Sequence, residues 1–267
     1  MIEVAFLGSG SSGNCAVVRA GRTAVLLDAG LSPRQVSMRL GKLGMRLEDV
    51  SALLLTHEHS DHVSSAGALA TRHGLPVWGT RGTIERAGLP GPLFADLHVV
   101  AGGEEVTFGG GDLTVRVTAT PHDGVDPVCY VFADGGGRRV GIATDLGHLS
   151  EEVLAALAGC EVLGLEANHD VDVLRSGPYP AFLKKRILSD VGHLSNNAAA
   201  AGLARLVDAR TRTVVGLHVS KQNNTPHIAE RALRAALEGL GAKIALEVAG
   251  PDAPTGWFRA WSAGGIG

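Results

Sequence analysis

The order of apolar runs along the chain is the feature that most limits its fold. In roughly the first hundred residues, runs typical of strands, such as EVAFLG and SALLLTH, alternate with helical segments. From about residue 97 to residue 144, short strand-like runs are separated by Gly-rich turns. Strands alternate with helices again from about residue 150. We therefore expect an α/β (α+β) fold in which two sheets form a sandwich covered by helices.

Composition and charge limit the partners of the chain. With 267 residues, 45% of them hydrophobic, it can bury a substantial core. The 24 Lys and Arg against 27 Asp and Glu give a net charge of -3, so a polyanion has to be bound by a local patch. No signal-peptide pattern and no apolar run near ~20 residues is present, so we expect no membrane association and a cytoplasmic location. No linker composition interrupts the chain, which favours a single domain over residues 1–267.

Histidines are concentrated in one short segment. His57, His59 and His62 fall within six residues, together with Asp61. The segment follows the buried strand ALLL, where a loop leaves the carboxyl end of a sheet. Imidazole and carboxylate are ligands that borderline divalent ions such as Zn²⁺ favour, with about three protein ligands per ion in catalytic sites. The spacing His-x-His-x-Asp-His predicts a site for two ions, against the alternative of a polar loop with solvated histidines.

The segment THEHSDH resembles the signature of metallo-β-lactamase-fold hydrolases. The resemblance implies a four-layer αββα sandwich that binds two divalent metal ions, Zn²⁺ or Mn²⁺. It also implies an early aspartate that supports the ligands without binding metal, which matches Asp28. The ligands implied are His57, His59 and His122 for one ion, Asp61, His62 and His218 for the other, and Asp145 as the bridge between them.

Four further segments narrow the resemblance. LGSGSSGNC, LEANHD, YPAFLKKRILSDVGHLSNN and SKQNNTP are similar to the YycJ (WalJ) branch of the superfamily. That branch implies a DNA exonuclease acting 5′ to 3′ through a metal-bridging hydroxide, with a link to mismatch repair. LEANHD and GHLS also resemble segments of tRNA 3′-processing relatives, which implies a catalytic histidine at His193 with Glu166 as its partner. The expected catalytic residues are thus Asp61, His193 and Glu166, although His193 also fits an ordinary residue before a helix.

Other residues are expected to contact the substrate or to support the ligands. Lys184, Lys185 and Arg186 form the local basic patch that a nucleic acid needs, since phosphate contacts bind without reading sequence. A solvated helix face is the alternative for that patch. Asn196 is a further expected substrate contact. His148 and His169 are expected to support the metal ligands without binding metal themselves. The alternative is that both are ordinary loop residues.

Two other classes of function stay open, because a fold does not determine a reaction. The same metal centre serves small-molecule phosphodiesterases and glyoxalase II-like thioester hydrolases. A binding or regulatory protein that kept the fold without turnover is a further alternative, disfavoured by the complete ligand set. The sequence leaves open the working metal, DNA versus RNA, the polarity of cleavage and the oligomeric state.

Overall fold

The computed structural model describes residues 1–89, 96–241 and 243–260. Within these residues, the strands form two sheets of seven strands each. Across the first sheet the strands lie in the order β14 (Phe258–Arg259), β1 (Ile2–Gly8), β2 (Cys15–Ala20), β3 (Thr23–Leu27), β4 (Ala52–Leu54), β5 (Val77–Gly79) and β6 (Leu97–Val99). Across the second sheet they lie in the order β13 (Ala245–Val248), β12 (Thr213–Leu217), β11 (Val162–Glu166), β10 (Arg139–Ala143), β9 (Val128–Asp134), β8 (Leu113–Ala119) and β7 (Glu105–Phe108).

Each sheet is antiparallel on one side and parallel on the other. In the first sheet, β1, β2 and β3 pair antiparallel, and β3 to β6 pair parallel. In the second sheet, β7 to β10 pair antiparallel, and β10 to β13 pair parallel. Parallel strands such as TAVLL and TVVGL are buried along their whole length, as expected for strands covered on both faces. Their carboxyl ends point the same way, so the loops that follow them leave from one edge.

Helices cover the outer faces of both sheets. The pair Ser32-Pro33 predicts the start of a helix. In the structure Ser32 accepts a hydrogen bond from the backbone N–H of Gln35, and Pro33 is the first residue of the helix. The helices are α1 (Pro33–Lys42), α2 (Ser60–Val63), α3 (Ala66–His73), α4 (Arg81–Arg86), α5 (Glu151–Leu157), α6 (Val171–Ser176), α7 (Ala181–Ile187), α8 (Asn196–Leu206) and α9 (Pro226–Gly239).

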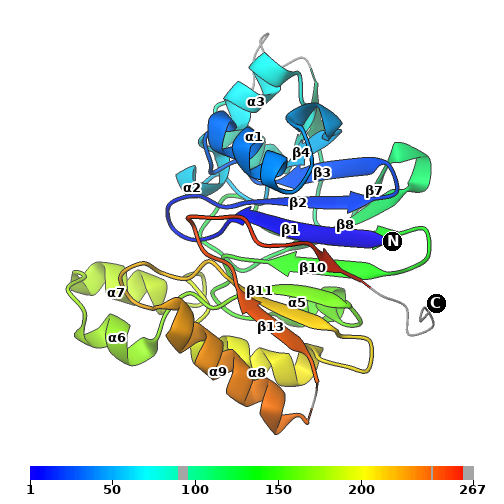
Figure 1. Cartoon of the computed structure of the whole chain (residues 1–267). Helices are drawn as coiled ribbons and strands as arrows, with labels where there is room; N and C mark the ends of the chain where they lie inside the picture. Colours follow the sequence, from blue (N-terminus) through cyan, green and yellow to red (C-terminus); the bar gives the residue numbers. More distant parts are fainter. Residues whose placement is uncertain (90–95, 242, 261–267) are drawn as a thin grey trace.

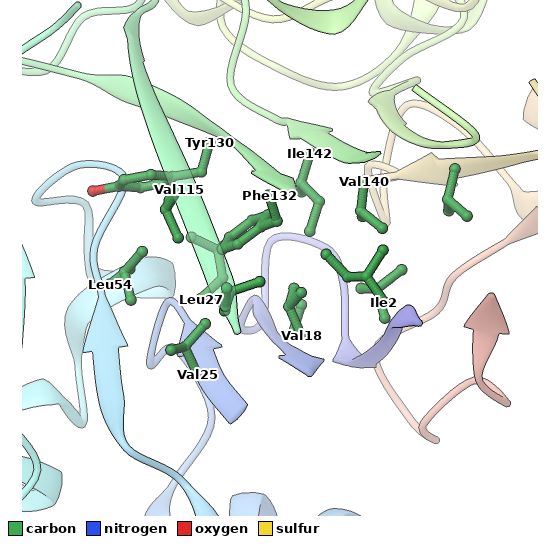
Figure 2. Close-up of a cluster of buried hydrophobic side chains, with 14 of the residues drawn as sticks. Ile2, Val18, Val25, Leu27, Leu54, Val115, Tyr130, Phe132, Val140 and Ile142 are labelled. Carbon is green, nitrogen blue, oxygen red and sulfur yellow. The ribbon is translucent and has the colours of Figure 1, made fainter. Parts of the chain in front are cut away.

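Three apolar layers hold these elements together. The central layer lies between the sheets, with Val25 and Leu54 from one sheet facing Phe132 and Ile142 from the other (Figure 2). A second layer joins α1, α3 and α4 to the first sheet, and a third joins α5, α8 and α9 to the second. Figure 1 shows α1 and α3 on one side of the two sheets and α8 and α9 on the other. The predicted four-layer αββα sandwich is confirmed, and its shared central layer supports the proposal of a single domain.

Local differences from the prediction are small. The helical turn α2 lies inside the histidine-rich segment, where a loop was expected, and α6 and β14 were not predicted. The last predicted strand, residues 242–249, is described from Ala245 to Val248, while residue 242 lies outside the described residues. Over the described ranges, no helix combines the length and the apolar character that crossing a membrane requires.

Candidate metal centre

The candidate ligands lie at strand ends or in the loops that follow them. In the first sheet, Asp28 follows β3, and residues 57–62 follow β4. In the second sheet, His122 follows β8, Asp145 follows β10 and His218 follows β12. Strands of both sheets therefore direct these side chains to one place. There the candidate ligands, which exclude Asp28, form groups whose donor atoms all lie within 4.8 Å of one another.

The first group consists of three imidazoles. His59 Nδ1 lies 3.0 Å from His57 Nε2 and 3.3 Å from His122 Nε2. His122 donates its Nδ1–H to the carbonyl of Gly192 at 2.9 Å, because a carbonyl can only accept. In the neutral ring this leaves a lone pair on Nε2, directed at the group. Burial, with a smaller contribution from His62, lowers the pKa of His57 well below its ordinary value, so the ring of His57 is neutral.

The second group combines Asp61, His62 and His218. Asp61 Oδ2 lies 3.2 Å from His218 Nε2 and 3.6 Å from His62 Nε2. Each ring is held from behind by a carboxylate, since His62 Nδ1 lies 2.7 Å from Asp28 Oδ2 and His218 Nδ1 lies 3.1 Å from Glu166 Oε1. A carboxylate at Nδ1 favours the tautomer that leaves Nε2 free to bind a metal.

Asp145 lies between the two groups. Its Oδ2 is 3.1 Å from His62 Nε2 without a hydrogen bond of normal geometry, and its Oδ1 is 3.8 Å from His122 Nε2. Burial alone would raise the pKa of Asp145, yet His218 and His62 hold it well below the ordinary value. The side chain is therefore an ionised carboxylate placed to contact both groups.

Backbone strain is concentrated at the same residues. Asp28, Asp145 and His218 have φ angles of 61°, 59° and 53°, and they are the non-glycine residues with positive φ in the described part of the chain. This left-handed conformation costs free energy for residues with a Cβ atom, and it persists where the surrounding structure enforces it. Its restriction to these three strand ends marks them as a functional site.

The donor set fits divalent cations. Buried carboxylates and imidazole nitrogens crowd together here, an arrangement that is costly unless a cation or a proton lies among them. Burial opposes protonation of His62, but Asp145 and Asp28 raise its pKa well above the ordinary value. An ion bound at the second group would displace that proton, so metal affinity should fall in acid.

Comparison with known protein families identifies the superfamily of this chain. A family model for the β-lactamase superfamily domain matches residues 23–219, a range that contains every candidate ligand. The chain belongs to this superfamily. The matched range includes the His-x-His-x-Asp-His segment and most strands of both sheets.

Individual members of the superfamily resemble the chain along nearly its whole length. Exodeoxyribonuclease YycJ of Bacillus anthracis is 34% identical over 260 residues, covering 95% of this chain and 97% of that protein. Exodeoxyribonuclease WalJ of Streptococcus pneumoniae is 34% identical over 267 residues, covering 96% and 98%. The metallo-β-lactamase fold protein YhfI from Bacillus subtilis has the same fold, with a TM-score of 0.71 at 16% identity over 95% of this chain and 98% of that one.

Glu166 is paired with His193, the partner that the resemblance implied for it. Its side chain is fully buried, and its Oε2 accepts the backbone N–H groups of Leu146 at 2.7 Å and Leu194 at 3.0 Å. Its Oε1 lies 2.8 Å from His193 Nδ1 and also contacts His218. Burial would raise the pKa of Glu166, but His193 lowers it to about 2. Glu166 thus contacts the rings of His193 and His218, and its catalytic role stays a prediction.

Three predicted residues do not take the expected places. His148 is exposed and its Nδ1 donates to the carbonyl of Asp190 at 3.0 Å, so this hydrogen bond gives no support to a candidate ligand. Asn196 is buried and exchanges hydrogen bonds with Asn224, which leaves its amide unavailable to a substrate. His169 is buried beside the centre, but its ring nitrogens bond no described residue. Burial lowers the pKa of His169 to about 4.

Asn14 is a site residue that the sequence did not reveal. Its Oδ1 accepts the backbone N–H of Gly10 at 2.8 Å, which directs Nδ2 into the centre. There Nδ2 lies 3.3 Å from Asp61 Oδ2 and 3.0 Å from His62 Nε2. Asn14 belongs to the LGSGSSGNC segment, which carried the resemblance without indicating this contact.

Replacement of Asp28 by asparagine should weaken metal binding about 10- to 100-fold, because His62 would lose the carboxylate that fixes its tautomer. The control is Asp112→Asn, because Asp112 also accepts a backbone N–H and a threonine hydroxyl but lies outside the centre. Competition with a metallochromic chelator measures the affinity. Unchanged affinity in Asp28→Asn would show that Asp28 has no role in metal binding.

Proposed function

We propose that this protein is a metal-dependent nuclease that degrades DNA from an end, in the 5′ to 3′ direction. The observation that carries the proposal is the His193–Glu166 pair beside the seven candidate ligands. The sugar alkoxide that leaves a phosphodiester needs a proton, whereas a thiolate, with an ordinary pKa of about 8.5, leaves more easily without one. Identity of 34% to two proteins named exodeoxyribonucleases supports the same conclusion.

The metal centre in this proposal holds two divalent ions, Zn²⁺ or Mn²⁺. Such ions would neutralise phosphate oxygens and lower the pKa of a water molecule from 15.7 to about 7. Asn14 orients the carboxylate of Asp61. Asp28 holds the ring of His62, and Glu166 holds that of His218. The proposed ligands are His57, His59 and His122 for one ion, Asp61, His62 and His218 for the other, and Asp145 between them.

His193 is proposed as the general acid. Its ring centroid lies 5.2 Å from that of His122 and 5.2 Å from that of His218, at the edge of the centre. Burial would lower its pKa, but the carboxylates of Glu166 and Asp145 raise it above the ordinary value. The ring therefore keeps its second proton to a higher pH than an ordinary histidine does. Glu166 holds Nδ1, so the proton offered to a leaving oxygen is the one on Nε2.

Phosphate contacts are proposed for the basic residues of α7. Arg186 donates from Nε and Nη2 to the carboxylate of Asp123, and Asp123 Oδ1 lies 3.3 Å from His122 Nε2. These two hydrogen bonds fix the guanidinium beside the centre and leave the Nη1 donors of Arg186 for a phosphate oxygen. Lys184 donates to the carbonyl of Arg175, and Lys185 is exposed. A role in DNA repair and a cytoplasmic location stay predictions.

A cleavage panel tests the proposal. Duplex DNA, single-stranded DNA and RNA, each labelled at the 5′ or the 3′ end, are incubated with the protein and Mn²⁺ beside bis-p-nitrophenyl phosphate. We expect DNA to be shortened, with the 5′ label released as the first small product. The Asp61→Ala variant, purified in parallel, controls for contaminating nucleases.

Other outcomes of the same panel would replace the proposal. Hydrolysis of the small ester alone would identify a small-molecule phosphodiesterase. If a glutathione thioester is added to the panel, its hydrolysis without cleavage of the other substrates would identify a glyoxalase II-like enzyme. A chain that binds no divalent ion and cleaves nothing would be a binding or regulatory protein.

A further inference from the structure

One aromatic side chain on α7 is left in solvent. Phe182 is 74% exposed, more than any other large hydrophobic residue in the described ranges. Leaving such a ring in water is unfavourable, and the sandwich gains no packing from it. Exposed apolar side chains of this kind mark binding sites when polar groups surround them.

The position of Phe182 connects it to the metal centre. Phe182 and Arg186 are four residues apart on a helix, so their side chains lie on the same face, one turn apart. Arg186 is joined to Asp123, whose Oδ1 lies 3.3 Å from His122 Nε2 and 3.6 Å from His59 Nε2. Figure 1 shows α7 and α2 toward the same end of the sandwich. The exposed ring therefore lies one helical turn from an arginine that is linked through Asp123 to the candidate ligands.

The charge around Phe182 indicates the kind of partner. The last turn of α7 carries Lys184, Lys185 and Arg186, and the helix has no acidic residue. An aromatic ring among cations is the combination that binds single-stranded nucleic acid, because the ring stacks on a base while the cations hold the backbone. A membrane or protein partner would not require the link through Asp123 to the metal centre.

We propose that Phe182 is the stacking platform for an unpaired nucleobase next to the phosphodiester that enters the metal centre. This inference rests on the proposed nuclease function and adds that the strand end is bound in single-stranded form. Arg186, one turn away, would hold the phosphate between the stacked base and the centre. Phe182 is thus a binding residue for DNA and takes no part in the chemical step.

Four variants test the inference. Phe182→Ala should raise the KM for single-stranded DNA about 10- to 100-fold, the range that loss of one base–aromatic contact gives. Phe182→Trp should keep the wild-type KM because it retains a ring, whereas Phe182→Leu, which is apolar but cannot stack, should behave like Phe182→Ala. Met38→Ala is the matched control, since Met38 is 52% exposed on α1, away from the centre. Metal content and turnover of bis-p-nitrophenyl phosphate should stay unchanged in all four.

A spectroscopic readout separates stacking from a general loss of binding. 2-Aminopurine near the strand end should lose fluorescence on binding to wild type and to Phe182→Trp, and keep it with Phe182→Ala.

The inference would be overturned if Phe182→Ala had the KM and the fluorescence quenching of wild type. It would also be overturned if Phe182→Leu behaved like wild type. A change in sedimentation without a change in DNA cleavage would overturn it too, by making Phe182 a contact between copies of the chain. Wild-type protein that cleaves no DNA would instead refute the proposed function.

Discussion

Alanine at position 61 is expected to lower DNA cleavage at least about a thousandfold and to reduce the metal content from two ions per chain to about one. Asp61 is the carboxylate of the second group, with its Oδ2 3.2 Å from His218 Nε2 and 3.6 Å from His62 Nε2. Without it, two imidazoles remain to hold that ion, and about three protein ligands are needed. Inductively coupled plasma mass spectrometry and the labelled-DNA assay measure the two effects.

Two further variants make this result interpretable. His62→Ala should lose the same ion, because His62 belongs to the same group. Asp49→Ala should keep both ions and full activity, because Asp49 pairs with Arg46 at the surface. Two ions per chain in both Asp61→Ala and His62→Ala would make the ligand assignment wrong.

Alanine at position 193 is expected to lower kcat about 10²- to 10⁴-fold while both metal ions stay bound. The reason is that His193 is the proposed proton donor and is absent from the proposed ligand set. The control is His148→Ala, because the Nδ1 of His148 bonds the carbonyl of Asp190, whereas that of His193 contacts the Glu166 carboxylate; His148→Ala should leave kcat unchanged. Loss of metal from His193→Ala would show that this ring acts as a ligand.

The pH dependence of kcat gives a second test of His193. Because Glu166 and Asp145 raise the pKa of His193, the ring stays protonated above its ordinary range, and kcat should fall as the pH rises through the raised value. Glu166→Gln removes the nearer carboxylate and lowers that pKa, so the fall in kcat should move to lower pH. An alkaline limb at the same pH in Glu166→Gln would exclude His193 as the acid.

Part of the candidate site could be predicted from the residues alone and part only through the family resemblance. The cluster of His57, His59, Asp61 and His62 is visible in the sequence, whereas His122, Asp145 and His218 were assigned by resemblance and each follows a strand. The helix beginning at Ser32 could be predicted because its capping residues are neighbours in the chain. These parts depend on local sequence or on a motif.

Contacts between distant positions could not be predicted in this way. Asn14 and His62 are 48 positions apart, and Arg186 and Asp123 are 63 apart, so no local pattern relates them. The expectation for Asn196 failed because its helix packs it against Asn224, a contact that only the folded chain creates. The partner of His148 could not be predicted either, because its ring bonds the carbonyl of Asp190, 42 positions along the chain.

The ligands come from both sheets, and this has a consequence for the synthesis of the protein. An emerging chain has the His-x-His-x-Asp-His segment early, but His218 comes only after most of the second sheet has been made. The complete centre therefore forms only when the two sheets have packed together. Loading with metal would follow tertiary folding, so nascent or misfolded chains would lack nuclease activity.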